Sequence, residues 1–71
     1  MKTIATQKGD SVTRARGETG LSMGKFAVKC GVSRPVISNI ESGVPVRETS
    51  AYKVAQALEK PFGELFDIAI V

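Results

Sequence analysis

The stretch "GVSRPVISNIES", residues 31–42, decides how this chain is expected to fold. Gly31 suits the left-handed position that ends a helix, and Ser33 suits the cap that begins the next one. Pro35 is tolerated in a first helical turn, because the backbone amides there have no intrahelical partners. The pattern therefore predicts a short helix over residues 34–42.

This predicted helix has two unlike sides when its residues are placed at 100° intervals. Val36, Ile37 and Ile40 lie on one side and must pack on a neighbouring helix. The other side is small and polar, and it carries Arg34, Pro35, Ser38, Asn39 and Ser42. Arginine and asparagine can contact guanine and adenine edges with two hydrogen bonds, and serine fits several base edges or a phosphate. The other interpretation of the same residues is an ordinary surface helix with a strong N-terminal signal.

Glycine, proline and capping residues divide the rest of the chain into further short helices. The predicted helices cover residues 11–18, 23–30, 34–42, 50–59 and a short segment after Pro61. A loop is expected at "VPVRET", because Pro45 restricts Val44 to extended conformations. No strand is predicted, and the two segments that come nearest to a strand pattern are "KTIAT" and the apolar tail. The expected fold class is all-α, a compact bundle of about five short helices. The helices over residues 23–30 and 34–42 form a central helix-turn-helix.

Size and composition exclude several classes of function. A chain of 71 residues favours one small domain without a catalytic cleft, so no enzyme is expected. Histidine is absent and Cys30 is the single cysteine, so neither a metal site nor a cofactor is expected, and Cys30 is interpreted as a core residue. No membrane span or signal peptide is recognisable, which predicts a cytoplasmic protein.

Charge is unevenly distributed along the chain. Residues 1–40 carry seven basic side chains against two acidic ones, whereas residues 41–71 carry three against five. A basic N-terminal half favours a polyanionic partner, although a solvated surface often has the same composition.

The order and spacing of these pieces resemble the helix-turn-helix regulators of the phage repressor/Cro or XRE type. The resemblance runs over about residues 11–66. It is carried by Arg16, "GLS" (20–22), Ala27, "GVS" (31–33), "IS" (37–38), "IE" (40–41), Gly43, "KVAQAL" (53–58) and "ELF" (64–66). It implies a lambda-repressor-like DNA-binding domain from a phage or prokaryote. The inward positions of that fold correspond to Val12, Leu21, Phe26, Ala27, Val32, Ile37, Ile40, Val54, Ala55, Leu58, Leu65 and Phe66.

The resemblance also implies roles for individual residues. Base reading falls on Ser33, Arg34, Pro35, Ser38 and Asn39, and phosphate contacts fall on Ser22, Met23, Lys25, Lys29, Ser42 and Arg47. An ion pair between Arg16 and Glu41 would tie the first helix to the third. The chain departs from the family pattern at Met23, where a polar residue is common, and at Gly24 and Lys25, which allow no capping box with Ser22.

Three segments are expected: a flexible N-terminal arm at residues 1–9, the DNA-binding domain at 10–67 and an apolar tail at 68–71. The tail either covers the core or adds a strand or helix at a dimer interface. The predicted function is a sequence-specific regulator of transcription that binds a double-stranded DNA operator as a homodimer, without a small-molecule ligand. The alternative is an antitoxin or antirepressor on the same scaffold, whose main partner is another protein.

Overall fold

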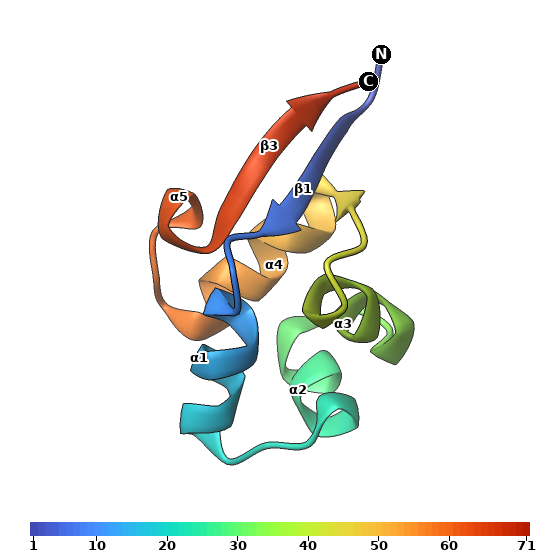
Figure 1. Ribbon diagram of the computed structural model, residues 1–71. Helices are drawn as coiled ribbons and strands as arrows, with labels where there is room; N and C mark the ends of the chain where they lie inside the picture. The colour runs from blue at the N-terminus through green and yellow to red at the C-terminus, as the bar shows by residue number, and fades with distance from the viewer.

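The chain folds into five short helices and three short strands (Figure 1). A computed structural model describes residues 1–71, with the elements β1 (Thr3–Gln7), α1 (Ser11–Thr19), α2 (Met23–Cys30), α3 (Arg34–Glu41), β2 (Val46–Arg47), α4 (Glu48–Leu58), α5 (Phe62–Leu65) and β3 (Phe66–Ile70). The five predicted helices are present, with bounds that differ by at most two residues. The all-α prediction needs correction, because the strands form a small antiparallel sheet. None of the helices combines the length and apolar character that crossing a bilayer requires.

Local signals set the helix ends. Gly20 and Gly31 follow α1 and α2 in the left-handed conformation, with φ of 75° and 77°. The Ser22 side chain accepts a hydrogen bond of 3.3 Å from the Lys25 N–H and so caps α2. Pro35 lies in the first turn of α3, where its missing N–H leaves no bond unmade.

Strand β1 is the centre of the sheet, whose order is β2-β1-β3. Its register sets Ala5 opposite Val46 on one neighbour and opposite Ile68 on the other. Lys2 and Val71 continue the pairing of β1 with β3 through two backbone hydrogen bonds of 2.7 and 2.8 Å.

The sheet contains parts of three segments that were predicted from the sequence as an arm, a loop and a tail. The flexible arm predicted for residues 1–9 is wrong for residues 3–7, which form β1. The loop predicted at "VPVRET" contains β2 and the first two residues of α4. The apolar tail at residues 68–71 pairs with β1 along its length. Each segment is ordered by a partner that lies far away in the sequence, which explains why local patterns did not reveal it.

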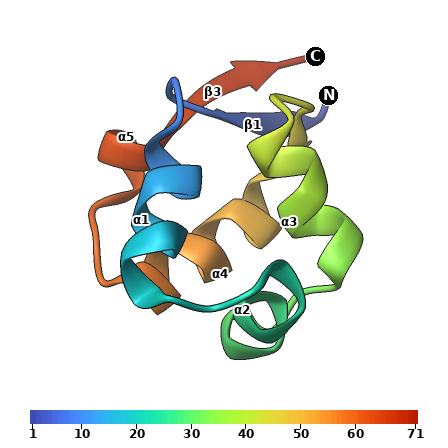
Figure 2. The same ribbon diagram turned by 60° about the horizontal axis from the view of Figure 1, so that its bottom comes forward.

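The core lies between the helices and one face of the sheet. Figure 2 shows α4 in the middle, with α1, α2 and α3 around it and the sheet across one end. Nine of the twelve residues predicted to point inward are buried, and Leu21, Val32 and Leu58 are half-buried against them. Ala5 and Val46 join the core from the sheet. Helix α3 packs mainly on α2 and also touches α1, β1 and β2, and this packing fixes its position.

Candidate nucleic-acid interface

Helices α2 and α3 form a helix-turn-helix whose second helix has one buried and one open side. Ile37 and Ile40 are fully buried, and they hold α3 against the core. On the opposite side Arg34, Pro35 and Asn39 are exposed, and Ser38 is half-buried. The five candidate base-reading residues, Ser33, Arg34, Pro35, Ser38 and Asn39, are called the α3 face below.

The polar side chains of the α3 face have no partner within the chain. Neither a hydrogen bond nor an ion pair within the chain involves the side chain of Ser33, Arg34, Ser38 or Asn39. Ser33 occupies the N-cap position of α3, yet its hydroxyl makes no capping bond. These donors and acceptors are free to bind a ligand.

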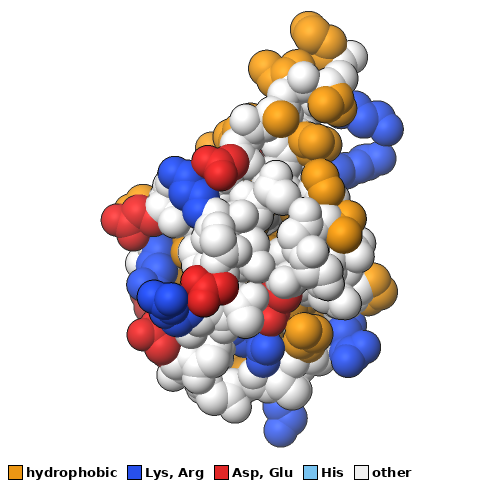
Figure 3. Space-filling model, in the orientation of Figure 1, with side chains coloured by type: hydrophobic (Ala, Val, Ile, Leu, Met, Phe, Trp, Pro, Cys, Tyr) orange, Lys and Arg blue, Asp and Glu red, His pale blue; other side chains and the backbone are white.

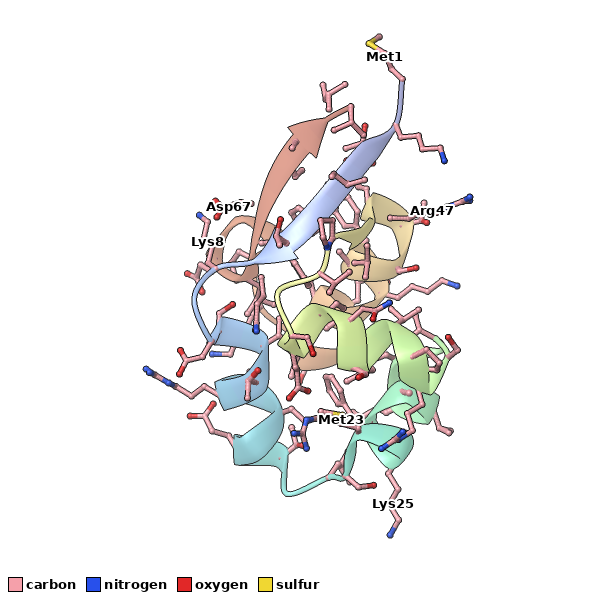
Figure 4. The ribbon with its side chains drawn as sticks, turned by 45° about the vertical axis from the view of Figure 1, so that its right-hand side comes forward. Met1, Lys8, Met23, Lys25, Arg47 and Asp67 are labelled. Carbon is pink, nitrogen blue, oxygen red and sulfur yellow. The ribbon has the colours of Figure 1, made fainter.

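Basic side chains lie at both ends of this region. In Figure 4, Lys25 of α2 and Arg47 of β2 lie toward the side occupied by α3, one below it and one above it. Lys29 and Ser42 are also exposed. Cations spaced along the border of a helix that enters a groove suit the phosphates on either side of that groove.

Met23 and Lys8 lie in surroundings that differ from the predicted ones. The Met23 side chain is half-buried against the core, so a phosphate contact at this position would have to come from its backbone N–H, which begins α2 and has no intrahelical partner. Lys8, placed within the flexible arm by the sequence, donates to the Gly63 carbonyl at 2.6 Å and lies 3.8 Å from Asp67. Figure 4 shows Lys8 and Asp67 on the side away from Lys25 and Arg47.

Arg16 of α1 meets Glu41 at the end of α3. The Arg16 Nε donates to Glu41 Oε2 at 2.6 Å, and Nη2 donates to Oε1 at 3.0 Å. Arg16 Nη1 also donates to the Leu21 carbonyl at 2.8 Å. The hydrogen bonds to Glu41 raise the pKa of Arg16 above its ordinary value, so the guanidinium stays charged. The pair fixes α1, α3 and the loop before α2 to one another.

Sequence reasoning missed Gln7, which connects the sheet to two helices. Its Oε1 accepts from the backbone N–H groups of Val12 and Thr13, at 3.0 and 3.3 Å, in the first turn of α1. Its Nε2 donates to Thr13 Oγ1 and to the Glu41 carbonyl, both at 3.3 Å. Gln7 thus caps the first turn of α1, and Asp10 makes no capping bond. No local signal marked this residue, because its role depends on where β1 lies.

The side chains of Cys30 and Tyr52 belong to the packing of the domain. Cys30 is buried in the core, and burial raises the pKa of its thiol above the ordinary value. Tyr52 is about half exposed and stacks on Phe62, with ring centroids 4.3 Å apart.

Comparison with known families agrees with this geometry. Residues 12–65 match the model of a helix-turn-helix family. Searches of curated proteins and of solved structures found no match. The matched span covers more than half of the chain and includes all five helices except Ser11, the first residue of α1. The chain therefore belongs to the XRE-type helix-turn-helix family, a family of DNA-binding regulators.

Proposed function

We propose that this protein is a sequence-specific regulator of transcription of the Cro/repressor kind, which inserts α3 into the major groove of double-stranded DNA. The single observation that carries the proposal is the α3 face, whose polar side chains have no partner within the chain and are exposed except for the half-buried Ser38, while Ile37 and Ile40 anchor the helix to the core. A major groove admits one α-helix, and its base edges present donors and acceptors to side chains on that helix.

The residues divide into two groups by task. Arg34 and Asn39 suit bidentate contacts to guanine and adenine, and the Pro35 ring suits a thymine methyl. Lys25, Lys29 and Arg47, with the hydroxyls of Ser22 and Ser42, suit phosphates and set the register on the duplex. The first group supplies sequence preference, and the second supplies most of the affinity and its dependence on salt.

The proposal includes the binding of two copies of the chain to one DNA site. The basic side chains around α3 are few, so one copy has a small number of phosphate contacts and binds weakly. Two copies on an inverted repeat, with half-sites about one helical turn apart, make the second contact intramolecular and raise the affinity.

Selection of bound duplexes from a random library tests the proposal. The expected result is enrichment of a short two-fold symmetric motif, and a binding constant for that motif that exceeds the value for a scrambled duplex by a factor of about 1,000 or more at matched salt. Binding without any enriched motif would contradict sequence-specific regulation.

A protein-binding module on the same scaffold, such as an antitoxin or antirepressor, is the second candidate. It is favoured by the apolar loop after α3, where Val44 is 45% exposed and Pro45 is exposed as well. The two candidates differ in the effect of Val44→Ser. This change should leave selected-duplex binding intact for a DNA reader, and it should weaken the main interaction if that interaction is with a protein.

A further inference from the structure

Strand β1 ends in a polar side chain that faces the helices. Figure 3 shows hydrophobic side chains gathered around the end of the sheet that projects past the helices, near the two termini. Gln7 is the last residue at the other end of β1. Alternate residues of a strand share a face, and paired residues point to the same face. Ala5 is buried, and so is Phe66, the residue that pairs with Gln7. The Gln7 side chain therefore points toward the helices.

The side-chain amide of Gln7 uses its oxygen and its nitrogen for different helices. Oε1 accepts from the N–H groups of Val12 and Thr13 and caps α1. Nε2 donates to the carbonyl of Glu41, the last residue of α3, and to Thr13 Oγ1. The oxygen faces two N–H donors and the nitrogen faces a carbonyl, so the orientation of the amide is fixed. A substitution that keeps one end of the amide and removes the other can separate the two tasks.

The carbonyl of Glu41 receives a hydrogen bond only from Gln7 within the chain. The N–H groups of the three residues after α3 donate to carbonyls earlier in that helix, and these residues are Ser42, Gly43 and Val44. Pro45 follows them and has no N–H to donate. The carbonyls at the end of a helix lack intrahelical donors, and here a side chain of the sheet supplies the missing donor for Glu41.

The two ends of α3 are held differently. At its last residue, the Glu41 carboxylate accepts from Arg16 of α1 at 2.6 and 3.0 Å, and the Glu41 carbonyl accepts from Gln7 of β1 at 3.3 Å. At its start, the hydroxyl of Ser33 makes no capping bond. Polar contacts from α1 and from the sheet thus meet at the end of α3, away from Arg34.

We propose that Gln7 is a positioning residue for the reading of DNA bases. It acts through the Glu41 carbonyl, which fixes the end of α3 and so the tilt at which Arg34 and Asn39 meet the base edges, and Gln7 itself does not touch DNA. Contacts in a binding site require side chains placed to within about 0.5 Å, and a small tilt of α3 moves its ends by a comparable distance. The inference rests on the proposed function for its effect at DNA, although the position of α3 is also measured without DNA.

Gln7→Glu removes the donor and keeps an acceptor. One carboxylate oxygen can still accept from the first turn of α1, whereas the other replaces Nε2 and faces the Glu41 carbonyl. The circular dichroism spectrum should stay that of a folded protein. The ratio of affinities for selected and scrambled duplexes should decrease by a factor of about 5. Gln56→Glu, at an exposed position of α4, adds the same charge and should leave this ratio unchanged.

Gln7→Met tests the same bond without an added charge. Methionine has a similar length but cannot donate to Glu41, so this variant should also lose discrimination between the duplexes. It loses the cap of α1 as well, and a control for lowered stability is therefore needed. Gln56→Gly weakens α4 through low helix propensity without contacting α3. It should lower Tm and keep the full ratio, because a purely structural effect does not change base preference in a folded chain.

Nuclear magnetic resonance of the backbone amides measures the position of α3 without DNA. If α3 tilts in Gln7→Glu and Gln7→Met, amide signals should shift along the whole helix, from Glu41 back to Arg34. A purely local effect would be confined to the residues next to Glu41. Gln56→Glu should leave the signals of α3 in place.

The outcomes separate this inference from the proposed function. Shifts confined to the neighbours of Glu41, or a folded Gln7→Met variant that keeps full discrimination, would each overturn the positioning role of Gln7. A parent chain without any sequence preference would overturn the proposed function, and the amide signals would still decide whether Gln7 sets the tilt of α3.

Discussion

Arg16 and Glu41 form a two-pronged ion pair, with donor–acceptor distances of 2.6 and 3.0 Å, that joins the first helix to the end of the third. The Glu41 side chain is only 5% exposed, and the Arg16 side chain is 20% exposed. Glu41 borders the apolar side of α3, and the pair explains why an acid is placed there. The pair also fixes the angle at which the α3 face is presented.

Removing one member of this pair should destabilise the fold strongly. Glu41→Ala leaves the Arg16 guanidinium largely buried with only the Leu21 carbonyl as acceptor, and such losses cost about 3 kcal/mol. Urea unfolding measures the change. The exposed pair of Asp10 and Arg14, at 3.3 Å, is the control, and Asp10→Ala should have little effect. An equal loss in the free energy of unfolding for the two variants would contradict the argument that burial makes the Arg16–Glu41 pair important for stability.

Gln7 should contribute more to stability than an ordinary surface glutamine. Gln7→Ala removes four hydrogen bonds that reach α1 and α3, and loss of a helix cap costs about 1 to 2 kcal/mol. Gln56 is exposed on α4 and makes no side-chain hydrogen bond within the chain, so Gln56→Ala is the matched control. Thermal unfolding should show a clear decrease in Tm for the first variant and none for the second; a silent Gln7→Ala would contradict the capping role.

Replacement of two glycines by alanine should change the stability of the protein in opposite directions. Gly17 lies within α1 with no atom near the position of an added Cβ, so Gly17→Ala should stabilise the protein by about 0.5–1 kcal/mol. Gly31 adopts φ of 77°, so Gly31→Ala should destabilise it by about 1–2 kcal/mol. Denaturant unfolding of both variants checks the signs, and a shift in the same direction for both would contradict the conformational argument.

Lys25 is expected to act on affinity without affecting preference. If it contacts a phosphate, Lys25→Ala should lower the slope of log K against log salt by about 0.9 and leave the ratio of selected to scrambled binding unchanged. Lys60, which lies beside Arg14, Glu18 and Glu64, is the control. A salt titration in which Lys60→Ala changes the slope as much as Lys25→Ala would place the DNA elsewhere on the surface.

The helices were predictable because their signals are local. Ser22 and Gly31 set the ends of α2 within a few residues, and the apolar spacing of α3 identifies which side is buried. The α3 face could be named from the sequence for the same reason, since Ile37 and Ile40 leave only one side free.

The sheet was not predictable in this way. Ile4 pairs with Ala69 at the far end of the chain, and neither strand is long enough to show a clear alternation of apolar and polar residues. Val46 joins the core through the separate pairing of β2 with β1, and the core position of Ala5 and the hydrogen bonds of Gln7 depend on where β1 lies. These contacts join residues that lie far apart in the sequence, so no local pattern indicates them.

The most direct test of the central claim is the effect of Arg34→Ala and Asn39→Ala on sequence preference. Each side chain is exposed and free of partners, so both variants should keep the parent circular dichroism spectrum and Tm. Each should lose about 1–3 kcal/mol of discrimination between the selected and scrambled duplexes, while Gln56→Ala loses none. Unchanged discrimination in both variants would contradict the claim that α3 reads the bases.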